Sequence, residues 1–112
     1  MITEAAVKCP PIERAKRLAL VSVNSFTNCV HILKLARKTF RGSLSAFEFM
    51  DRECMAIMDK AFGVQMPFTE MKENFYLLVE VLDREDDDSC TDTKLLSFLE
   101  SCGDLIEDGV VP

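Results

Sequence analysis

The sequence has few glycines and prolines, the residues that end helices and strands, and few residues of the types used in catalysis. Its 112 residues include no tryptophan, one histidine, four glycines and four prolines. It also lacks an apolar run of the ~18–20 residues that a bilayer-spanning helix needs, so no membrane partner is expected. No charged-then-apolar leader opens the chain, which argues against a secretory signal. Ile2 follows the first methionine and the chain ends in GVVP, so neither myristoylation nor prenylation is expected.

Motifs of the common enzyme classes are missing as well. There is no P-loop, no dinucleotide-binding fingerprint and no nucleophile elbow. His31 lies on the polar, basic side of an expected helix, which is typical of a surface histidine rather than a general base. No local signature pairs it with a cysteine nucleophile. The sequence therefore predicts a protein that is not an enzyme, with no catalytic residues and no cofactor.

The cysteines argue against a disulfide scaffold and against a zinc site. They are five in number, they are widely spaced and no C-x-x-C pair occurs among Cys9, Cys29, Cys54, Cys90 and Cys102. Cys29, Cys54 and Cys102 fall on expected apolar helix stripes, where reduced cysteines act as small buried hydrophobes. This usage indicates a reducing intracellular compartment, either cytoplasm or nucleus.

Composition and charge indicate one globular domain with two opposed halves. The chain is 48 % hydrophobic and 29 % charged, which suits a packed domain rather than a disordered segment. Residues 1–45 carry a formal charge of +6 and residues 46–112 carry −12, giving the net −6. Such an asymmetry indicates that the halves pack on one another or that one face meets a charged partner.

Apolar residues recur in steps of three and four along most of the chain, which predicts helices. No segment alternates at period two for long enough to indicate a strand. The expected helices cover residues 12–41, residues 45–62, the segment after Thr69 through Leu82, and the segment from Thr91 or Asp92 through Ile106.

Several residues fit the ends of these helices. Ser45 and Glu48 form a capping box at the start of the second helix. Gly42 and Gly63 fit helix C-caps. Helix 12–41 would be too long for a compact globule, so it either breaks near Asn24-Ser25 or projects and pairs with another copy.

The expected fold class is therefore all-α: a compact bundle of four to five helices in a single domain. Residues 1–11 are expected to form an N-terminal arm and residues 107–112 a tail.

One acidic loop resembles a calcium-binding loop. In DREDDDSCTDTK, the carboxylates of Asp83, Glu85 and Asp87 fill positions 1, 3 and 5 of a twelve-residue calcium loop. With eight Phe, six Met and an acidic balance, residues 52–102 are similar to EF-hand proteins. However, position 6 is Asp88 where glycine is needed, and position 12 is Lys94 where a glutamate is needed. The resemblance implies only a degenerate, calcium-responsive helix pair, and no metal site is predicted.

A second resemblance is to acyl carrier proteins. The segment GSLSAFEF at residues 42–49 looks like the segment around their cofactor-bearing serine, which would make Ser43 the attachment point. Glycine stands where that family has aspartate, and the helix expected to follow is several residues too long. Ser43 is therefore interpreted as a serine that flanks a helix.

The remaining signals favour binding to another protein. Helix 12–41 is apolar beyond one buried stripe, and small residues in its first half would let another helix approach closely. The function expected is a non-enzymatic interaction module, namely an adaptor, inhibitor or regulatory subunit, able to self-associate as a homo-oligomer through this helix. The candidate partner-binding residues are Ala15, Ala19, Phe26, Lys34, Arg37, Lys38 and Arg41.

Nucleic-acid binding is the alternative. The four basic residues of that set lie within two helical turns and could contact phosphates. The acidic overall charge and the absence of interleaved aromatic residues argue against it.

Overall fold

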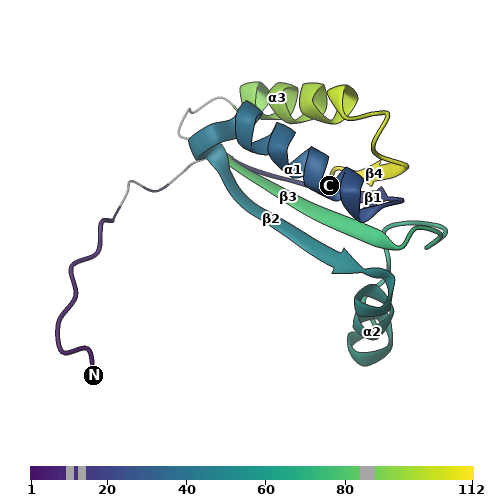
Figure 1. Cartoon of the computed structure of the whole chain (residues 1–112), viewed down its shortest axis with the longest axis horizontal. Helices are drawn as coiled ribbons and strands as arrows, with labels where there is room; N and C mark the ends of the chain where they lie inside the picture. Colours follow the sequence, from purple (N-terminus) through teal and green to yellow (C-terminus); the bar gives the residue numbers. More distant parts are fainter. Residues whose placement is uncertain (10–11, 13–14, 84–87) are drawn as a thin grey trace.

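The chain folds as a four-stranded antiparallel sheet with two helices packed on one face (Figure 1). The computed structural model describes residues 1–9, 12, 15–83 and 88–112. The elements in chain order are β1 (Ala15–Val23), α1 (Phe26–Phe40), a 3-10 turn (Arg41–Ser43), β2 (Leu44–Asp51), α2 (Arg52–Phe62), β3 (Phe75–Asp83), α3 (Asp88–Ser101) and β4 (Asp108–Val110). The expected all-α bundle is therefore wrong.

The strands run in the order β2-β3-β1-β4, and every neighbouring pair is antiparallel. The two central strands pair over their whole length, from Ala15 opposite Asp83 to Val23 opposite Phe75. With α2 inserted between β2 and β3, the chain order β–α–β–β–α–β is that of a ferredoxin-like fold. The helices of the two crossover connections, α1 and α3, cover the same face of the sheet (Figure 1).

The first half of the expected helix 12–41 is the central strand β1. Its inner face places Ala19, Val21 and Val23 in the core, whereas Leu20 and Ser22 point to the outer face. Because Leu18 and Leu20 on the outer face are apolar as well, the period-two alternation of this strand is hidden. The chain does break at Asn24-Ser25, where Ser25 caps α1 by accepting a hydrogen bond from the backbone N–H of Asn28.

The first half of the expected helix 45–62 is also a strand. Residues 44–51 form the edge strand β2, so Ser45 and Glu48 do not form a capping box. Asp51 is the N-cap of α2 instead, because its carboxylate accepts a hydrogen bond from the backbone N–H of Cys54 at 2.7 Å. Gly63 ends α2 in the left-handed conformation, as expected for a C-cap.

The third expected helix, which ends at Leu82, is in fact the central strand β3. The fourth expected helix is a helix in the structure. In β3, Leu77 and Val79 face the helices, whereas Tyr76 and Glu80 lie on the outer face. The last expected helix is confirmed as α3, although it ends at Ser101. The segment 107–112, expected to be a tail, contains β4, which pairs with β1. Residues 1–9 form neither helix nor strand and extend away from the sheet (Figure 1).

The two faces of the sheet are covered unequally. The main core lies between the sheet and the helices α1 and α3. On the outer face, a smaller cluster of Met55, Phe68 and Tyr76 joins α2 and the segment 63–74 to one end of the sheet. The other end of the outer face keeps side chains that are exposed or half-buried, among them Lys16, Leu18 and Leu82. None of the helices in the described residues is long and apolar enough to cross a membrane.

Candidate functional site

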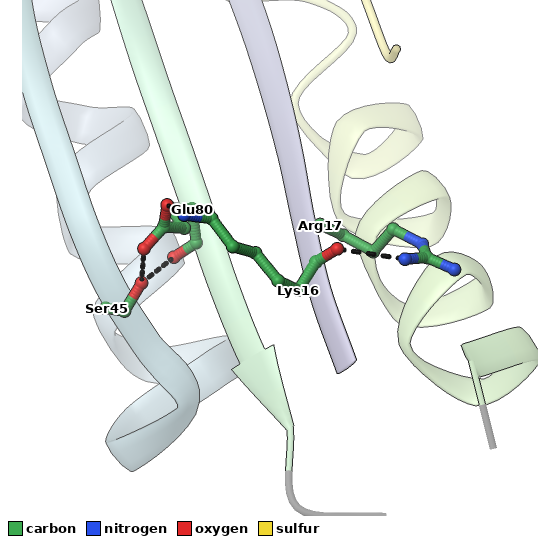
Figure 2. A network of polar contacts seen from close by, with 4 residues as sticks. All are labelled: Lys16, Arg17, Ser45 and Glu80. Atoms are coloured by element: carbon green, nitrogen blue, oxygen red, sulfur yellow. Dashed lines mark hydrogen bonds and ion pairs between the residues drawn. The ribbon is translucent and has the colours of Figure 1, made fainter. Parts of the chain in front are cut away.

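Three strands meet in a polar network on the open end of the outer face. Figure 2 shows Glu80 of β3 between Lys16 of β1 and Ser45 of β2. The ammonium of Lys16 lies 2.7 Å from one carboxylate oxygen of Glu80, and the hydroxyl of Ser45 lies 2.5 Å from the other. The same hydroxyl lies 3.3 Å from the Glu80 carbonyl oxygen. The network therefore ties the edge strand to both central strands.

The environment of Glu80 favours its charged form. The hydrogen bond from Lys16, followed by the one from Ser45, lowers the pKa of the Glu80 carboxyl below its ordinary value. Only 18 % of this side chain is exposed, whereas that of Lys16 is 59 % exposed. Lys16 and Ser45 are therefore the exposed members of this network, and Glu80 is the more buried one.

Apolar side chains surround this network. In the strand pairing, Leu82 lies opposite Lys16, Leu18 lies opposite Glu80, and Leu20 lies opposite Leu78. These leucines are half-buried, and Leu20 packs against the cluster of Met55, Phe68 and Tyr76. The Lys16 ammonium, within a partly covered apolar face, can orient an anionic group or contact a neighbouring domain. A protonated ammonium is not a nucleophile.

A second ion pair joins the sheet to the helical layer. The guanidinium of Arg17 pairs with the carboxylate of Asp92 in α3 and also donates to the carbonyl oxygen of Lys16 at 2.9 Å. Adjacent residues of β1 thus anchor the strand to β3 on one side and to α3 on the other. This arrangement ties the open end of the sheet to the helical layer.

The buried thiols and the buried phenol do not suit nucleophilic or acid–base chemistry. Burial raises the pKa of the Cys29 and Cys102 thiols, which keeps them protonated. Burial, followed by the charge of Glu73, also raises the pKa of Tyr76, whose hydroxyl is buried. Both cysteines are buried as expected, but Cys54 is exposed.

The predicted partner-binding residues are distributed over several parts of the fold. Ala15 and Ala19 are buried in β1 beneath the helical layer, so their side chains cannot contact a partner. Phe26 opens α1 and is 58 % exposed. Its ring packs edge-on against Phe49 at a centroid distance of 5.5 Å and lies 6.4 Å from Phe75.

The predicted basic residues stay together. Lys34, Arg37 and Lys38 are exposed on the second half of α1, and Arg41 follows its end. Arg37 and Lys38 lie in the last turn, where positive charge is stabilised by the helix dipole. His31 is exposed on the same helix.

The calcium-loop prediction lies mostly outside the described residues. Glu85 and Asp87 fall in the undescribed segment 84–87, and Asp83 ends β3. Because β3 is a strand, the helix pair of an EF-hand does not form. Within the described ranges, no group of three or more His, Cys, Asp or Glu side chains could hold a metal ion. Ser43 lies in the 3-10 turn before β2, not before a helix of the acyl carrier kind.

Reading the sequence as helices missed Lys16, Ser45 and Glu80. A usable signal was present, because Glu80 is the one charged residue within the apolar segment FYLLVEVL of residues 75–82. Acidic residues are seldom buried without a partner. The identity of the partners depends on strand pairing, which brings positions 16 and 45 next to position 80.

The fold and this face define the chain as a ferredoxin-like domain with one covered and one half-open sheet face. Its sequence matches the family described as FAD linked oxidases, C-terminal domain, over residues 12–110, and the chain belongs to that family.

Named relatives agree with the family. The chain is 36 % identical over 114 residues to "Probable D-2-hydroxyglutarate dehydrogenase, mitochondrial" of Oryza sativa subsp. indica, covering 99 % of this chain and 20 % of the relative. It is 30 % identical over 113 residues to the mitochondrial D-2-hydroxyglutarate dehydrogenase of Danio rerio, with the same two coverages. A mitochondrial protein of Schizosaccharomyces pombe named as a candidate D-lactate dehydrogenase is 32 % identical over 113 residues, covering 99 % of this chain and 21 % of the relative.

The chain thus spans about a fifth of the length of the relatives it matches. A solved dimeric ferredoxin-like protein of unknown function from Thermobifida fusca aligns with 87 % of this chain and 85 % of its own, at 13 % identity and a TM-score of 0.44.

These comparisons overturn the functional expectations. A non-enzymatic adaptor or regulatory subunit, its nucleic-acid-binding alternative and the calcium-responsive reading are wrong, because the chain belongs to a domain family of FAD-linked oxidases. The expectation that the protein is not an enzyme is contradicted by the same relatives, which are dehydrogenases. Their mitochondrial names agree with an intracellular location but give no support to cytoplasm or nucleus.

The described residues do not fit FAD itself. A dinucleotide needs donors for its pyrophosphate, usually backbone N–H groups of a glycine-rich turn. The glycines here are isolated at 42, 63, 103 and 109. One hollow of about 450 Å³ near the end of β1 is lined mainly by carboxylates, which would repel a pyrophosphate; its lining is Ser22, Thr69, Glu70, Lys72, Glu73, Glu107 and Asp108.

Proposed function

We propose that this chain is the C-terminal-type domain of an FAD-linked dehydrogenase that oxidises a D-2-hydroxy acid. The observation that carries the proposal is the family match over residues 12–110, together with dehydrogenase relatives that align with nearly the whole chain. In this reaction the C2 alcohol becomes a ketone, and two electrons and two protons leave the substrate.

The substrate class proposed is D-2-hydroxyglutarate, because relatives from rice and zebrafish carry that name. D-lactate is the competing substrate, supported by the fission yeast relative. The two differ by a second carboxylate, so a basic group near the substrate would favour hydroxyglutarate. A mitochondrial location is part of the proposal, since all three relatives carry it in their names.

In this proposal the domain contributes a surface next to the substrate or the flavin-holding part of the enzyme and does not itself hold the electron acceptor. The ion pair of Lys16 with Glu80 links β1 to β3, and the ion pair of Arg17 with Asp92 links β1 to α3. Burial raises the pKa of the Cys29 and Cys102 thiols and of the Tyr76 phenol, so none of these three groups suits a nucleophile. The residues that hold FAD are expected in another part of the enzyme.

The test is a turnover assay on the full-length product that contains this chain, purified with its flavin. We expect reduction of an artificial electron acceptor with D-2-hydroxyglutarate, weaker reduction with D-lactate and none with the L-enantiomers. If a flavin-loaded preparation turned over no D-2-hydroxy acid, the proposed function would be wrong.

A further inference from the structure

The outer face of α1 carries positive charge and no negative charge. Four exposed cations follow the i, i+3, i+4, i+7 spacing of one helix face; they are Lys34, Arg37, Lys38 and Arg41, the last directly after the helix. We call these four residues the basic stripe. Residues 26–43 contain no acidic residue, so this segment carries +4 while the rest of the chain carries −10. The stripe therefore reverses the charge of the molecule locally.

The described residues do not neutralise the basic stripe. Among them, its four side chains form no ion pair and no hydrogen bond, whereas Lys16, Arg17 and Lys72 are each paired with a carboxylate. On the side toward α3, which lies beside α1 in Figure 1, is a hollow of about 280 Å³ without a carboxylate. Its lining is Thr39, Thr93, Lys94, Ser97, Phe98 and Ser101. This face thus offers cations and hydroxyl groups to an approaching anion.

The backbone at Arg41 is a second, independent observation. Among the described residues it is the one residue other than glycine with a positive φ, at 49°. Its N–H closes the end of α1 by donating to the carbonyl oxygen of Arg37. Glycine is preferred at such a position, because a Cβ atom makes a positive φ costly. Strain of this kind is typical of positions whose side chain has a function.

The composition of the basic stripe indicates a transient contact rather than permanent cover by the rest of a longer enzyme. Lysine is depleted from buried interfaces, and burying unpaired cations is costly. The surfaces suited to permanent burial are the apolar ones, such as the half-buried Leu18 and Leu82 and the exposed Ile57 and Phe62 of α2. The stripe is instead suited to a separate partner that binds reversibly through charge.

We propose that the basic stripe of α1 is a docking surface for a separate protein that presents a helix with carboxylates along one face. The stripe covers two helical turns, about 10 Å, and guanidinium groups pair with carboxylates through two parallel hydrogen bonds. A membrane surface or a long nucleic acid would extend beyond the stripe and be repelled by the acidic remainder of the chain. An acidic helix meets the stripe alone. The proposal does not depend on the substrate or activity proposed above.

The first test is an NMR titration of the isotopically labelled 112-residue chain with a helical peptide of about 20 residues that carries glutamates on one face. Four surface ion pairs give an expected dissociation constant of roughly 0.1–1 mM at about 20 mM salt, weakened about tenfold at about 150 mM. Chemical shift changes should be confined to α1, the turn after it and the facing side of α3. A peptide isomer with the same glutamates spread around the helix should bind at least about threefold more weakly.

A matched pair of charge reversals locates the surface. Lys34→Glu with Lys38→Glu should weaken binding of the one-face peptide about tenfold or more, because two attractive charges become repulsive. Lys8→Glu with Lys60→Glu changes the net charge equally at exposed lysines elsewhere, and should stay within about threefold of the parent chain. Unchanged far-ultraviolet circular dichroism confirms that each variant is folded.

Arg41→Gly separates the function of this residue from the stability of the fold. Glycine adopts the positive φ without strain, so the midpoint of thermal unfolding should be unchanged or raised. Peptide binding should nevertheless weaken about two- to fivefold, because one cation of the stripe is lost. Unchanged peptide binding would show that the strained arginine takes no part in docking.

Four further outcomes overturn the proposal. The first is equal weakening by the two double charge reversals. The second is tighter binding of an oligouridylate, or of vesicles of phosphatidylcholine with about a fifth of phosphatidylglycerol, than of the one-face peptide, which would assign the stripe to another class of partner. The third is protection of Lys34 and Lys38 from an amine-modifying reagent in the flavin-loaded full-length product, which would show that the rest of the enzyme covers the stripe. The fourth is self-association of the parent chain that Lys34→Glu with Lys38→Glu abolishes, which would make a second copy the partner.

Discussion

At the scale of single residues, Glu80 shows how a charged group is accommodated on a central strand. Its carboxylate lies between the ammonium of Lys16 and the hydroxyl of Ser45, and these contacts lower its pKa. Because the folded-state pKa is depressed, the ionised carboxylate stabilises the fold above the ordinary glutamate pKa of about 4.3. This contribution is lost as the pH falls through the lowered pKa.

We predict that Glu80→Gln lowers the free energy of unfolding at pH 7 by about 0.5–1 kcal/mol, a small value because the network is partly solvated. The difference from the parent chain should shrink as the pH is lowered, since the parent then also loses its charge. Urea unfolding at several pH values measures both effects. Glu48→Gln, an exposed glutamate on β2, should change neither. Equal effects of the two substitutions would contradict a role of the network.

The backbone conformation at position 63 favours glycine over any other residue. It ends α2 with φ of 62°, in the left-handed region that costs a residue with a Cβ atom about 1–2 kcal/mol. Gly63→Ala should therefore destabilise the chain by about 1 kcal/mol in urea unfolding. Gly42→Ala is the control, because Gly42 has no positive φ and no atom lies within 4 Å of its added Cβ. It should be neutral or slightly stabilising, and a loss at Gly42 as large as that at Gly63 would refute the conformational explanation.

At the scale of elements, α2 depends on its ends more than α1 does. α1 buries Cys29, Ile32, Ala36 and Phe40 against the sheet, whereas α2 buries only Met55. Tertiary packing supplies most of the stability of a helix in a protein. The caps of α2 must therefore carry a larger share of its stability.

We predict that Asp51→Ala loosens α2 without unfolding the sheet. The N-cap hydrogen bond to the Cys54 N–H is worth about 1 kcal/mol. Its loss should increase amide hydrogen exchange within α2, and leave exchange in β1 and β3 unchanged. Asp51→Asn keeps a side-chain acceptor and should preserve most of the protection. Uniformly faster exchange over the whole chain would show that the cap stabilises more than its own helix.

At the scale of the whole molecule, the core between sheet and helices holds the fold together. Phe98 of α3 is 2 % exposed and packs edge-on against Phe40 of α1, with ring centroids 4.9 Å apart. This contact joins the two crossing helices above β1 and β3. A small domain has only about 5–15 kcal/mol of stability in total.

Phe98→Ala is therefore expected to cost about 3–5 kcal/mol and to leave the chain partly or wholly unfolded at 37 °C. Thermal unfolding followed by circular dichroism measures the loss. Leu96→Ala, two residues away on the same helix and half-exposed, is the control and should shift the midpoint little. A similar loss for both variants would show that this core does not supply most of the stability of the fold.

The sequence by itself determined the local features, which depend on near neighbours in the chain. The α3 helix and the left-handed Gly63 were predicted because helix periodicity and C-cap glycine are local signals. The burial of Cys29 and Cys102 was predicted correctly for the same reason. The break at Asn24-Ser25 was also visible, because the predicted helix was too long for the domain.

The tertiary structure alone decided which apolar segments are strands. β1 and β3 carry leucines on the half-open outer face as well as buried residues on the inner face, so apolar residues occur at both odd and even spacings and a helical stripe can be traced through them. The enrichment of Val, Phe and Tyr in these segments favours strands, but it is a weaker signal than periodicity. The network of Lys16, Ser45 and Glu80 could not be predicted for a related reason. Its members lie up to 64 positions apart in the chain, and only the pairing of β1, β3 and β2 brings their side chains within hydrogen-bonding distance.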